Sequence, residues 1–86
     1  MGKYEVLLRR SILKKDLARI AKADVRRIME AIRSLGDNPR PPGVKKLSGQ
    51  ERYRLRQGDY RIVFSIQDEE HSVWIVKVAH RRQVYL

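Results

Sequence analysis

Three arginines between residues 54 and 61 can be brought onto one face of a β-hairpin. Apolar and polar residues alternate on both sides of a Gly-Asp pair at 58–59, and that pair favours a two-residue type II′ turn. Such a turn fixes the register, so we expect Arg56 directly opposite Arg61, with Arg54 on the same face. Guanidinium groups gathered in this way would bind an anion, and they match a phosphodiester bidentately.

The opposite face of this predicted hairpin is apolar, and we expect it to form part of the core under the helices. It carries Tyr53, Leu55, Tyr60, Ile62, Phe64 and Ile66. On the basic face, two arginines directly opposite each other would destabilise the sheet by about 0.2–1 kcal/mol. An anion between them would account for the pair. The alternative is a solvated face whose arginines lie flat over their neighbours. Three arginines on one face of a strongly basic chain favour the anion site.

The last residues of the chain could complete such a site. His80, Arg81, Arg82 and Tyr85 follow a third predicted strand, and the end of that strand would deliver them beside the arginines of the hairpin. Taken singly, a histidine or tyrosine is more often a packing or surface residue, and two arginines are more often a charged surface. The predicted site therefore depends on the convergence of these residues with the hairpin.

The charge of the whole chain points to an anionic partner. Among 86 residues, 20 Lys and Arg face 10 Asp and Glu, which gives a formal net charge of +10. Nucleic acid is the usual partner for this imbalance, because each neutralised phosphate releases a condensed counterion. A basic surface that serves solubility and an anionic membrane surface are the alternatives, and an acidic protein is a compatible second partner. The basic residues predicted to contact RNA outside the hairpin site are Lys45, Lys46, Arg52, Lys77 and Arg82.

Several classes of protein are disfavoured by composition. The chain has no cysteine, so neither disulfides nor a Cys-based metal site are expected. It has no apolar run of transmembrane length, and its apolar N-terminal run is too short for a signal peptide, so we expect a cytoplasmic protein. Paired carboxylates, a Ser/His/Asp set and metal-ligand spacings are missing, and Glu69 and Glu70 are expected to be solvated turn charges. We therefore expect no metal and no cofactor.

The elements that must position the site follow from hydrophobic periodicity. Residues 3–8 alternate as a short strand, and Ser11 is a candidate N-cap for a first helix. The apolar stripe of that helix is predicted at Leu13, Leu17 and Ile20. A second helix is predicted after an N-cap at Asp24 and before a terminating Gly36, with its stripe at Val25, Ile28, Met29, Ile32 and Leu35.

The remaining segments predict one small α+β domain that spans residues 1–86. A connector rich in Pro and Gly at 37–49 leads into the hairpin, and a third strand at about 72–79 follows a polar turn. The apolar run 73–76 in that strand indicates either a central strand or a bulge. The predicted order is β-α-α-β-β-β, with a two-helix hairpin packed on a mainly antiparallel twisted sheet.

The chain resembles the RelE/ParE toxin superfamily over nearly its whole length. The resemblance lies in the amphipathic helix pair and in three motifs, NPRPPGVKKLSG, RYRLRQGDYRIVF and the terminal HRRQVY. Because the basic residues and the tail tyrosine occur together, the chain is most similar to the RelE branch, archaeal and thermophilic RelE-like toxins included. The resemblance implies a type II toxin that enters the ribosomal A site, cleaves mRNA and is held inactive by a cognate acidic antitoxin.

The resemblance also implies a mechanism in which the 2′-OH of the scissile nucleotide attacks the adjacent phosphate without a metal. The matching positions are Arg54 and Arg56 on the first hairpin strand, Arg61 after the turn, and Arg81 and Tyr85 in the tail. We expect Arg61 and Arg81 to stabilise the phosphorane, and Arg54 and Arg56 to position the RNA backbone. Some relatives carry lysines where this pair stands, and arginine is a poor proton-transfer group.

Proton transfer would fall to one of two residues. Tyr85 would need a strongly lowered pKa to act as a base, whereas His80 has an ordinary pKa near neutrality, so both remain open. Two other functions are compatible with the sequence. One is a ParE-like inhibitor of DNA gyrase without nuclease activity, and the other is a basic nucleic-acid-binding module without toxicity.

Overall fold

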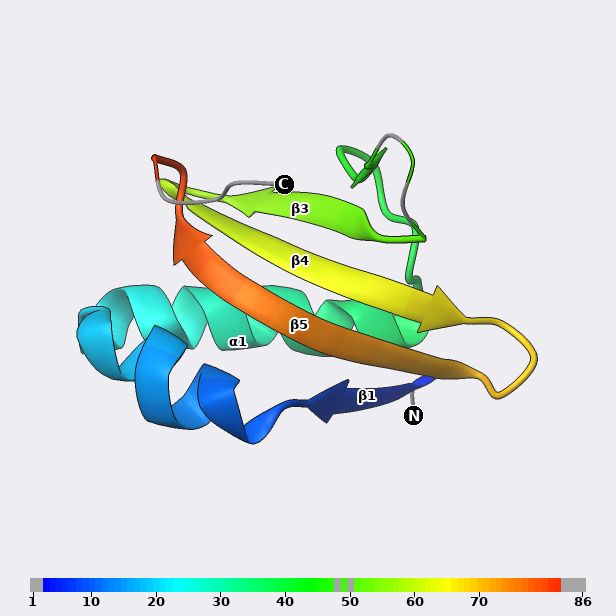
Figure 1. Cartoon of the computed structure of the whole chain (residues 1–86), viewed down its shortest axis with the longest axis horizontal. Coiled ribbons are helices and arrows are strands. Elements are labelled where there is room, and N and C mark those ends of the chain that lie inside the picture. Colours follow the sequence, from blue (N-terminus) through cyan, green and yellow to red (C-terminus); the bar gives the residue numbers. More distant parts are fainter. Residues whose placement is uncertain (1–2, 48, 50, 83–86) are drawn as a thin grey trace.

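The computed structural model describes residues 3–47, 49 and 51–82, and it has the α+β architecture expected from the sequence (Figure 1). The elements are β1 (Glu5–Leu8), η1 (Ile12–Asp16), η2 (Leu17–Arg19), α1 (Lys22–Asp37), β2 (Lys45–Lys46), β3 (Tyr53–Gln57), β4 (Tyr60–Gln67) and β5 (Ser72–His80). No helix in these ranges is long and apolar enough to cross a membrane.

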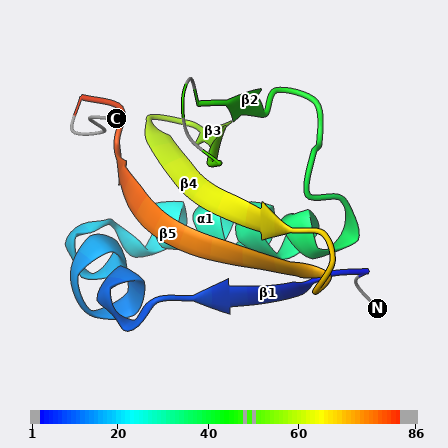
Figure 2. The ribbon, with the colours of Figure 1, turned by 45° about the vertical axis from the view of Figure 1, so that its right-hand side comes forward.

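The five strands form one sheet in the order β1-β5-β4-β3-β2. β1 runs parallel to β5, and the other neighbouring strands are antiparallel. α1 crosses one face of the sheet, and η1 packs against β5 on the way to it (Figures 1 and 2). We call the face that α1 covers the inner face and the opposite face the outer face.

The hairpin formed by β3 and β4 has the predicted register. Arg56 pairs with Arg61, and Tyr53 pairs with Phe64. Gly58 has a φ of 59° whereas Asp59 does not enter the left-handed region, as a type II′ turn requires. The predicted apolar face is the inner face, where it packs with α1 and β5. The fully or largely buried core comprises Ile12, Leu17, Ile28, Ile32, Leu35, Ile62, Phe64, Val73, Ile75 and Val78.

The long helix α1 has the predicted apolar stripe but different ends. It begins at Lys22 after an N-cap at Ala21, so Asp24 lies in the first turn instead of capping the helix. A carboxylate there still interacts favourably with the helix dipole. Gly36 lies inside the helix and is buried. A Cβ on Gly36 would stand 3.1 Å from the carbonyl oxygen of Tyr4, so this glycine allows α1 to approach β1 closely.

The first helical segment packs Leu17 and Ile20 of the predicted stripe against the core, but not Leu13. Leu13 is 58% exposed, whereas Ile12 is fully buried. The segment is a π-helical turn followed by a 3-10 turn, so the spacing of 3.6 residues does not apply to it. Its geometry brings the Asp16 carboxylate to the edge of β5, where Oδ2 accepts a hydrogen bond of 2.9 Å from the Val78 backbone N–H. This edge is open because β1 pairs with β5 only as far as Ile75.

The interior strand β5, between β1 and β4, contains a bulge. Val63 of β4 pairs with Lys77, but the next residue, Phe64, pairs with Ile75, so Val76 is an extra residue on β5. The sequence left a bulge and a central strand covered on both faces as alternatives for the run 73–76. β5 has the bulge, and its outer face is not covered, since Trp74 is exposed. The bulge reverses which side chains of the second half of β5 reach the outer face.

Candidate active site on the outer face of the sheet

Basic side chains occupy two adjacent cross-strand rows on the outer face. One row runs across four strands and consists of Lys45, Arg54, Val63 and Lys77. The next row consists of Arg56, Arg61 and Ala79. Residues directly opposite each other share a face of the sheet, so the strand register alone gathers these cations. The two small apolar residues, one in each row, are buried among them.

The end of β5 brings a further arginine to these rows. The backbone N–H of Arg81 donates a hydrogen bond of 2.8 Å to the carbonyl of Asp59 in the hairpin turn. This bond holds the exit of β5 against the β3–β4 turn. We call Arg54, Arg56, Arg61 and Arg81 the arginine cluster.

The members of the cluster are close enough to repel one another. The pKa of Arg61 is lowered from its ordinary value, first by partial burial and then by the charges of Arg56, Arg54 and Arg81, while Asp59 opposes the shift. An arginine remains cationic at neutral pH even so. The cluster therefore holds concentrated positive charge at a half-buried position, which favours a bound anion.

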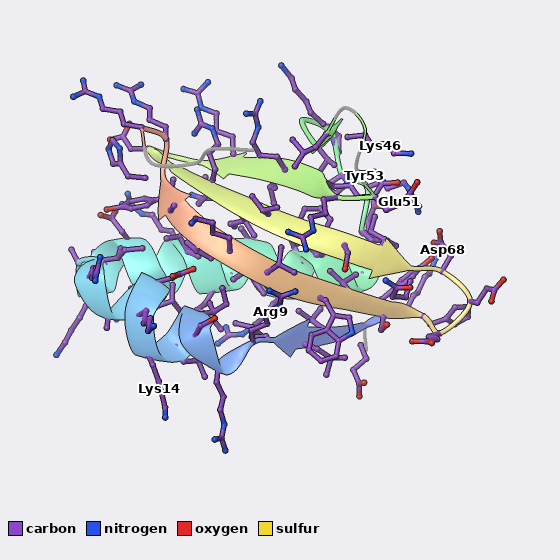
Figure 3. The ribbon with its side chains drawn as sticks, in the orientation of Figure 1. Arg9, Lys14, Lys46, Glu51, Tyr53 and Asp68 are labelled. Carbon is purple, nitrogen blue, oxygen red and sulfur yellow. The ribbon has the colours of Figure 1, made fainter. Side chains whose placement is uncertain are left out.

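No acidic side chain of the described residues forms an ion pair with this cluster. The ion pairs in the described ranges are Arg40 with Asp68, at 2.9 Å, and Lys46 with Glu51, at 3.7 Å (Figure 3). Arg61 donates from Nη1 to the carbonyl oxygen of Tyr60, at 3.2 Å, and this bond orients the guanidinium without neutralising it. The cluster is thus charged and available to a ligand.

His80 lies on the other side of the sheet. It pairs with Tyr60, whose ring packs against the core, and the two rings meet edge-on with centroids 5.7 Å apart. Its Nδ1 accepts a hydrogen bond of 3.3 Å from the Arg82 backbone N–H, and it lines a polar depression together with Asp24 and Arg27. The bulge at Val76 places His80 on the inner face. Without it, strict alternation from the start of β5 would have put His80 on the outer face.

The other predicted RNA contacts divide between the faces. Lys45 and Lys77 lie on the outer face. The bulge at Val76 is what brings Lys77 to that face. Lys46 is opposite Tyr53 and therefore points away from the arginine cluster, toward Glu51.

The remaining predicted contacts flank the strands. Arg52 is half-buried just before β3, and Arg82 is exposed just after β5. Tyr85 lies outside the described residues.

One cluster that the sequence did not predict holds the connector in place. Asp68, in the β4–β5 turn, accepts hydrogen bonds from the Tyr4 hydroxyl at 2.8 Å and from the Arg40 guanidinium at 2.9 and 3.2 Å. The Arg40 guanidinium also lies over the Tyr53 ring, 5.5 Å from its centroid. These groups are 28 and 64 residues from Asp68 in sequence, so local patterns could not reveal them. They fix the loop that leads to β2 and hence to Lys45.

Comparison with known proteins identifies the family to which the chain belongs. The family model described as the ParE toxin of the type II toxin-antitoxin system parDE matches residues 8–85. The chain belongs to the RelE/ParE superfamily of toxins. A putative toxin RelE1 from Methanocaldococcus jannaschii is 28% identical over 87 residues, with 96% of each chain covered.

Solved structures place this RelE-like toxin near the archaeal and mycobacterial RelE proteins. The RelE–RelB complex from Pyrococcus horikoshii OT3 matches with a TM-score of 0.82 and 31% identity, over 95% of this chain and 99% of that one. The toxin–antitoxin complex RelBE2 from Mycobacterium tuberculosis matches with a TM-score of 0.80 and 26% identity, over 92% and 99%. The resemblance stated from the sequence motifs is thereby confirmed, and so is the fold.

Proposed function

We propose that this toxin is a ribosome-dependent endoribonuclease that cleaves mRNA in the cytoplasm. The observation that carries the proposal is the arginine cluster, in which four cations meet on the outer face without an ion-pair partner among the described residues. A scissile phosphate is the anion that suits such a group. Membership of a toxin superfamily and similarity to RelE proteins support the same reading.

In the proposed reaction, the 2′-OH of one nucleotide attacks the adjacent phosphorus and the 5′-oxygen of the next nucleotide leaves. The products are a 2′,3′-cyclic phosphate and a 5′-OH, and no metal takes part. Arg61 and Arg81 stabilise the charge of the phosphorane, as preorganised donors do in other phosphoryl transfers. Arg54 and Arg56 hold the backbone in line for attack. The flanking contacts to RNA fall to Lys45, Arg52, Lys77 and Arg82, whereas Lys46, on the other face, pairs with Glu51.

The reaction needs proton transfer at the attacking and leaving oxygens, and arginines supply it poorly. Tyr85 and His80 remain the two candidates. The position of His80 on the inner face favours Tyr85, since an ordinary β-strand side chain cannot act through the sheet. A weak base within the protein also suits an enzyme whose site is completed by ribosomal RNA.

We further propose that a cognate acidic antitoxin inhibits the protein. The similar RelE proteins of P. horikoshii and M. tuberculosis were solved as complexes with their antitoxins. A formal net charge of +10 and an unneutralised cluster provide the complementary surface for an acidic chain that folds on binding.

Primer extension on mRNA from cells that express the toxin tests the proposal. Discrete cleavage sites are expected while translation is active, and they should disappear when initiation is blocked. Arg61→Ala and Arg81→Ala should each abolish the cuts. Arg33→Ala, which removes an exposed arginine of α1, is the matched control and should retain them. Full cleavage by both folded cluster variants would exclude this site.

Inhibition of DNA gyrase is the second candidate, because the matching family model carries the description of a ParE toxin. That function requires binding to an enzyme and no chemistry on RNA. It predicts DNA damage after expression, with no new 5′ ends on translated mRNA. The same cells can be examined for both signals.

A further inference from the structure

The outer face carries an aromatic side chain that the core does not use. Trp74, in the interior strand β5, is 38% exposed and is not part of the buried cluster. It pairs with Leu7 of β1 and Ser65 of β4, so its indole stands on the same face as the arginine cluster. Among the described residues, the other exposed large hydrophobic side chain is Leu13, in η1.

Lys77 lies between Trp74 and the arginine cluster on the outer face. Ser65, the partner of Trp74 on β4, is four residues beyond Arg61, which corresponds to about 13 Å along the strand at ~3.3 Å per residue. The row of Val63 and Lys77 lies between them. At about 3.4 Å per stacked nucleotide, this distance is no more than roughly four nucleotides.

The charges of the side chains around Trp74 indicate what kind of partner binds there. On the side toward Arg61, the next row on the outer face carries the cation Lys77 on β5 itself, with Arg54 two strands away in the same row. The first acid on the other side is Glu5, one row further from the cluster, opposite Ser72. An aromatic group beside a cationic track is the arrangement by which proteins bind single-stranded nucleic acid without reading its sequence.

We propose that Trp74 is a stacking platform for a base of the RNA strand whose phosphate occupies the arginine cluster. The inference rests on the proposed function and extends it by giving the path of the RNA, which runs along the outer face of β4 and β5 from Arg61 past Lys77 to Trp74. The arginines hold phosphates, and the indole holds a base. The toxin would therefore require a base near this position but would discriminate little among the four bases.

Intrinsic fluorescence tests the proposal directly, because Trp74 is the one tryptophan in the chain. The probe is a short 2′-O-methyl RNA, which lacks the nucleophile for cleavage, and its control is an abasic oligomer of equal length and charge. The base-bearing oligomer should quench the indole emission at saturation. The abasic oligomer should bind through its phosphates and leave the emission nearly unchanged.

Binding of dye-labelled oligomers to variants supplies the second readout. Trp74→Ala should weaken binding of the base-bearing oligomer about 5- to 150-fold, the range that corresponds to loss of one base–aromatic stack, and should leave binding of the abasic oligomer unchanged. Trp74→Phe should restore most of the loss. Leu13→Ala, which also removes an exposed apolar side chain, should affect neither oligomer.

The outcomes separate this proposal from the proposed function. If the base-bearing oligomer binds in an Arg61-dependent manner but leaves the indole emission unchanged, the stacking platform is refuted and the nuclease assignment stands. If Trp74 is quenched in this way but no translation-dependent cuts occur in cells, the RNA path stands and the ribosomal activity is refuted. Equal losses for both oligomers in Trp74→Ala would show a structural role and overturn the proposal.

Discussion

Arg61 is the residue of the cluster at which repulsion between like charges has a resolved effect on the pKa. It is half-buried, its pKa is lowered by burial and by three neighbouring arginines, and Arg56 lies directly opposite it on β3. Like charges placed directly opposite each other in a sheet oppose folding. The cluster is therefore kept at some cost in stability, as is common where a site must bind an anion.

Replacing Arg56 with threonine tests this cost. Arg56→Thr removes one partner of the like-charge pair and introduces a residue that suits an exposed strand position, so the free energy of unfolding should rise by up to about 1 kcal/mol. The gain should shrink at 1 M salt, where exposed charges are screened. Urea unfolding at low and high salt measures both effects. A loss of stability that is independent of salt would mean that packing of the arginine stem matters more than its charge.

Asp68 has the opposite role, because it stabilises the fold through its charge. Hydrogen bonds from Arg40, and then from Tyr4, lower the pKa of the Asp68 carboxyl. A carboxyl whose pKa is lowered on folding contributes stability above its unfolded pKa of about 3.9 and loses it as the pH falls through the folded value. Asp68→Asn should therefore lower the unfolding midpoint at pH 7 and leave it close to that of the wild type near pH 2. Equal losses at both pH values would contradict this role for the charge.

At the scale of elements, the junction between η1 and β5 shows how an irregular turn completes a sheet. The Asp16 carboxylate accepts the Val78 N–H just beyond the last residue that β1 pairs with. Asp16→Ala would leave this partly buried donor without its partner, which costs about 1–3 kcal/mol. Denaturant unfolding should show that loss, and amide exchange at Val78 should accelerate. Asp16→Asn keeps an acceptor oxygen and should retain most of the stability; if it is as unstable as Asp16→Ala, the hydrogen bond is not the cause.

Elements defined by local pattern were predicted correctly, and those defined by long-range geometry were not. The hairpin register followed from a two-residue turn and a period of two, and the apolar stripe of α1 followed from a period of 3.6. In the first helical segment, Leu17 and Ile20 pack on the core as predicted, but Ile12 is buried in place of Leu13, because a π-helical turn changes the angular spacing. The two-residue strand β2 and the parallel pairing of β1 with β5 have no local signal.

In the candidate site, too, positions set by local pattern were predicted and positions set by the bulge were not. Arg54, Arg56 and Arg61 share a face by register, and the sequence was sufficient to predict it. His80 was expected beside them, but the bulge in β5 turns it to the inner face. The sequence indicated a bulge only as one of two alternatives, and it did not show where the extra residue would lie. The role of Trp74 was hidden for the same reason, within an apolar run whose two faces could not be separated.

At the scale of the whole molecule, charge and architecture divide the surface. The helices cover the inner face, and the outer face presents the arginine cluster, the lysines of two flanking strands and one exposed tryptophan. A formal net charge of +10 draws anionic partners to the molecule, and the sheet register determines where phosphates can be held at close range. The superfamily accounts for the fold, whereas the availability of these particular cations is what supports the proposal that the toxin cleaves RNA.

The most direct test of this account is mRNA cleavage by the purified toxin in a reconstituted translation reaction, under single-turnover conditions. The wild type and Arg33→Ala should cut ribosome-bound mRNA at equal rates and leave a 2′,3′-cyclic phosphate. Arg61→Ala and Arg81→Ala should each slow the cut by about 100-fold or more, as loss of one charge-stabilising donor does elsewhere. Cleavage at the wild-type rate by both cluster variants, or a 3′ end without the cyclic phosphate, would contradict the claim that these arginines bind the scissile phosphate during attack by the 2′-OH.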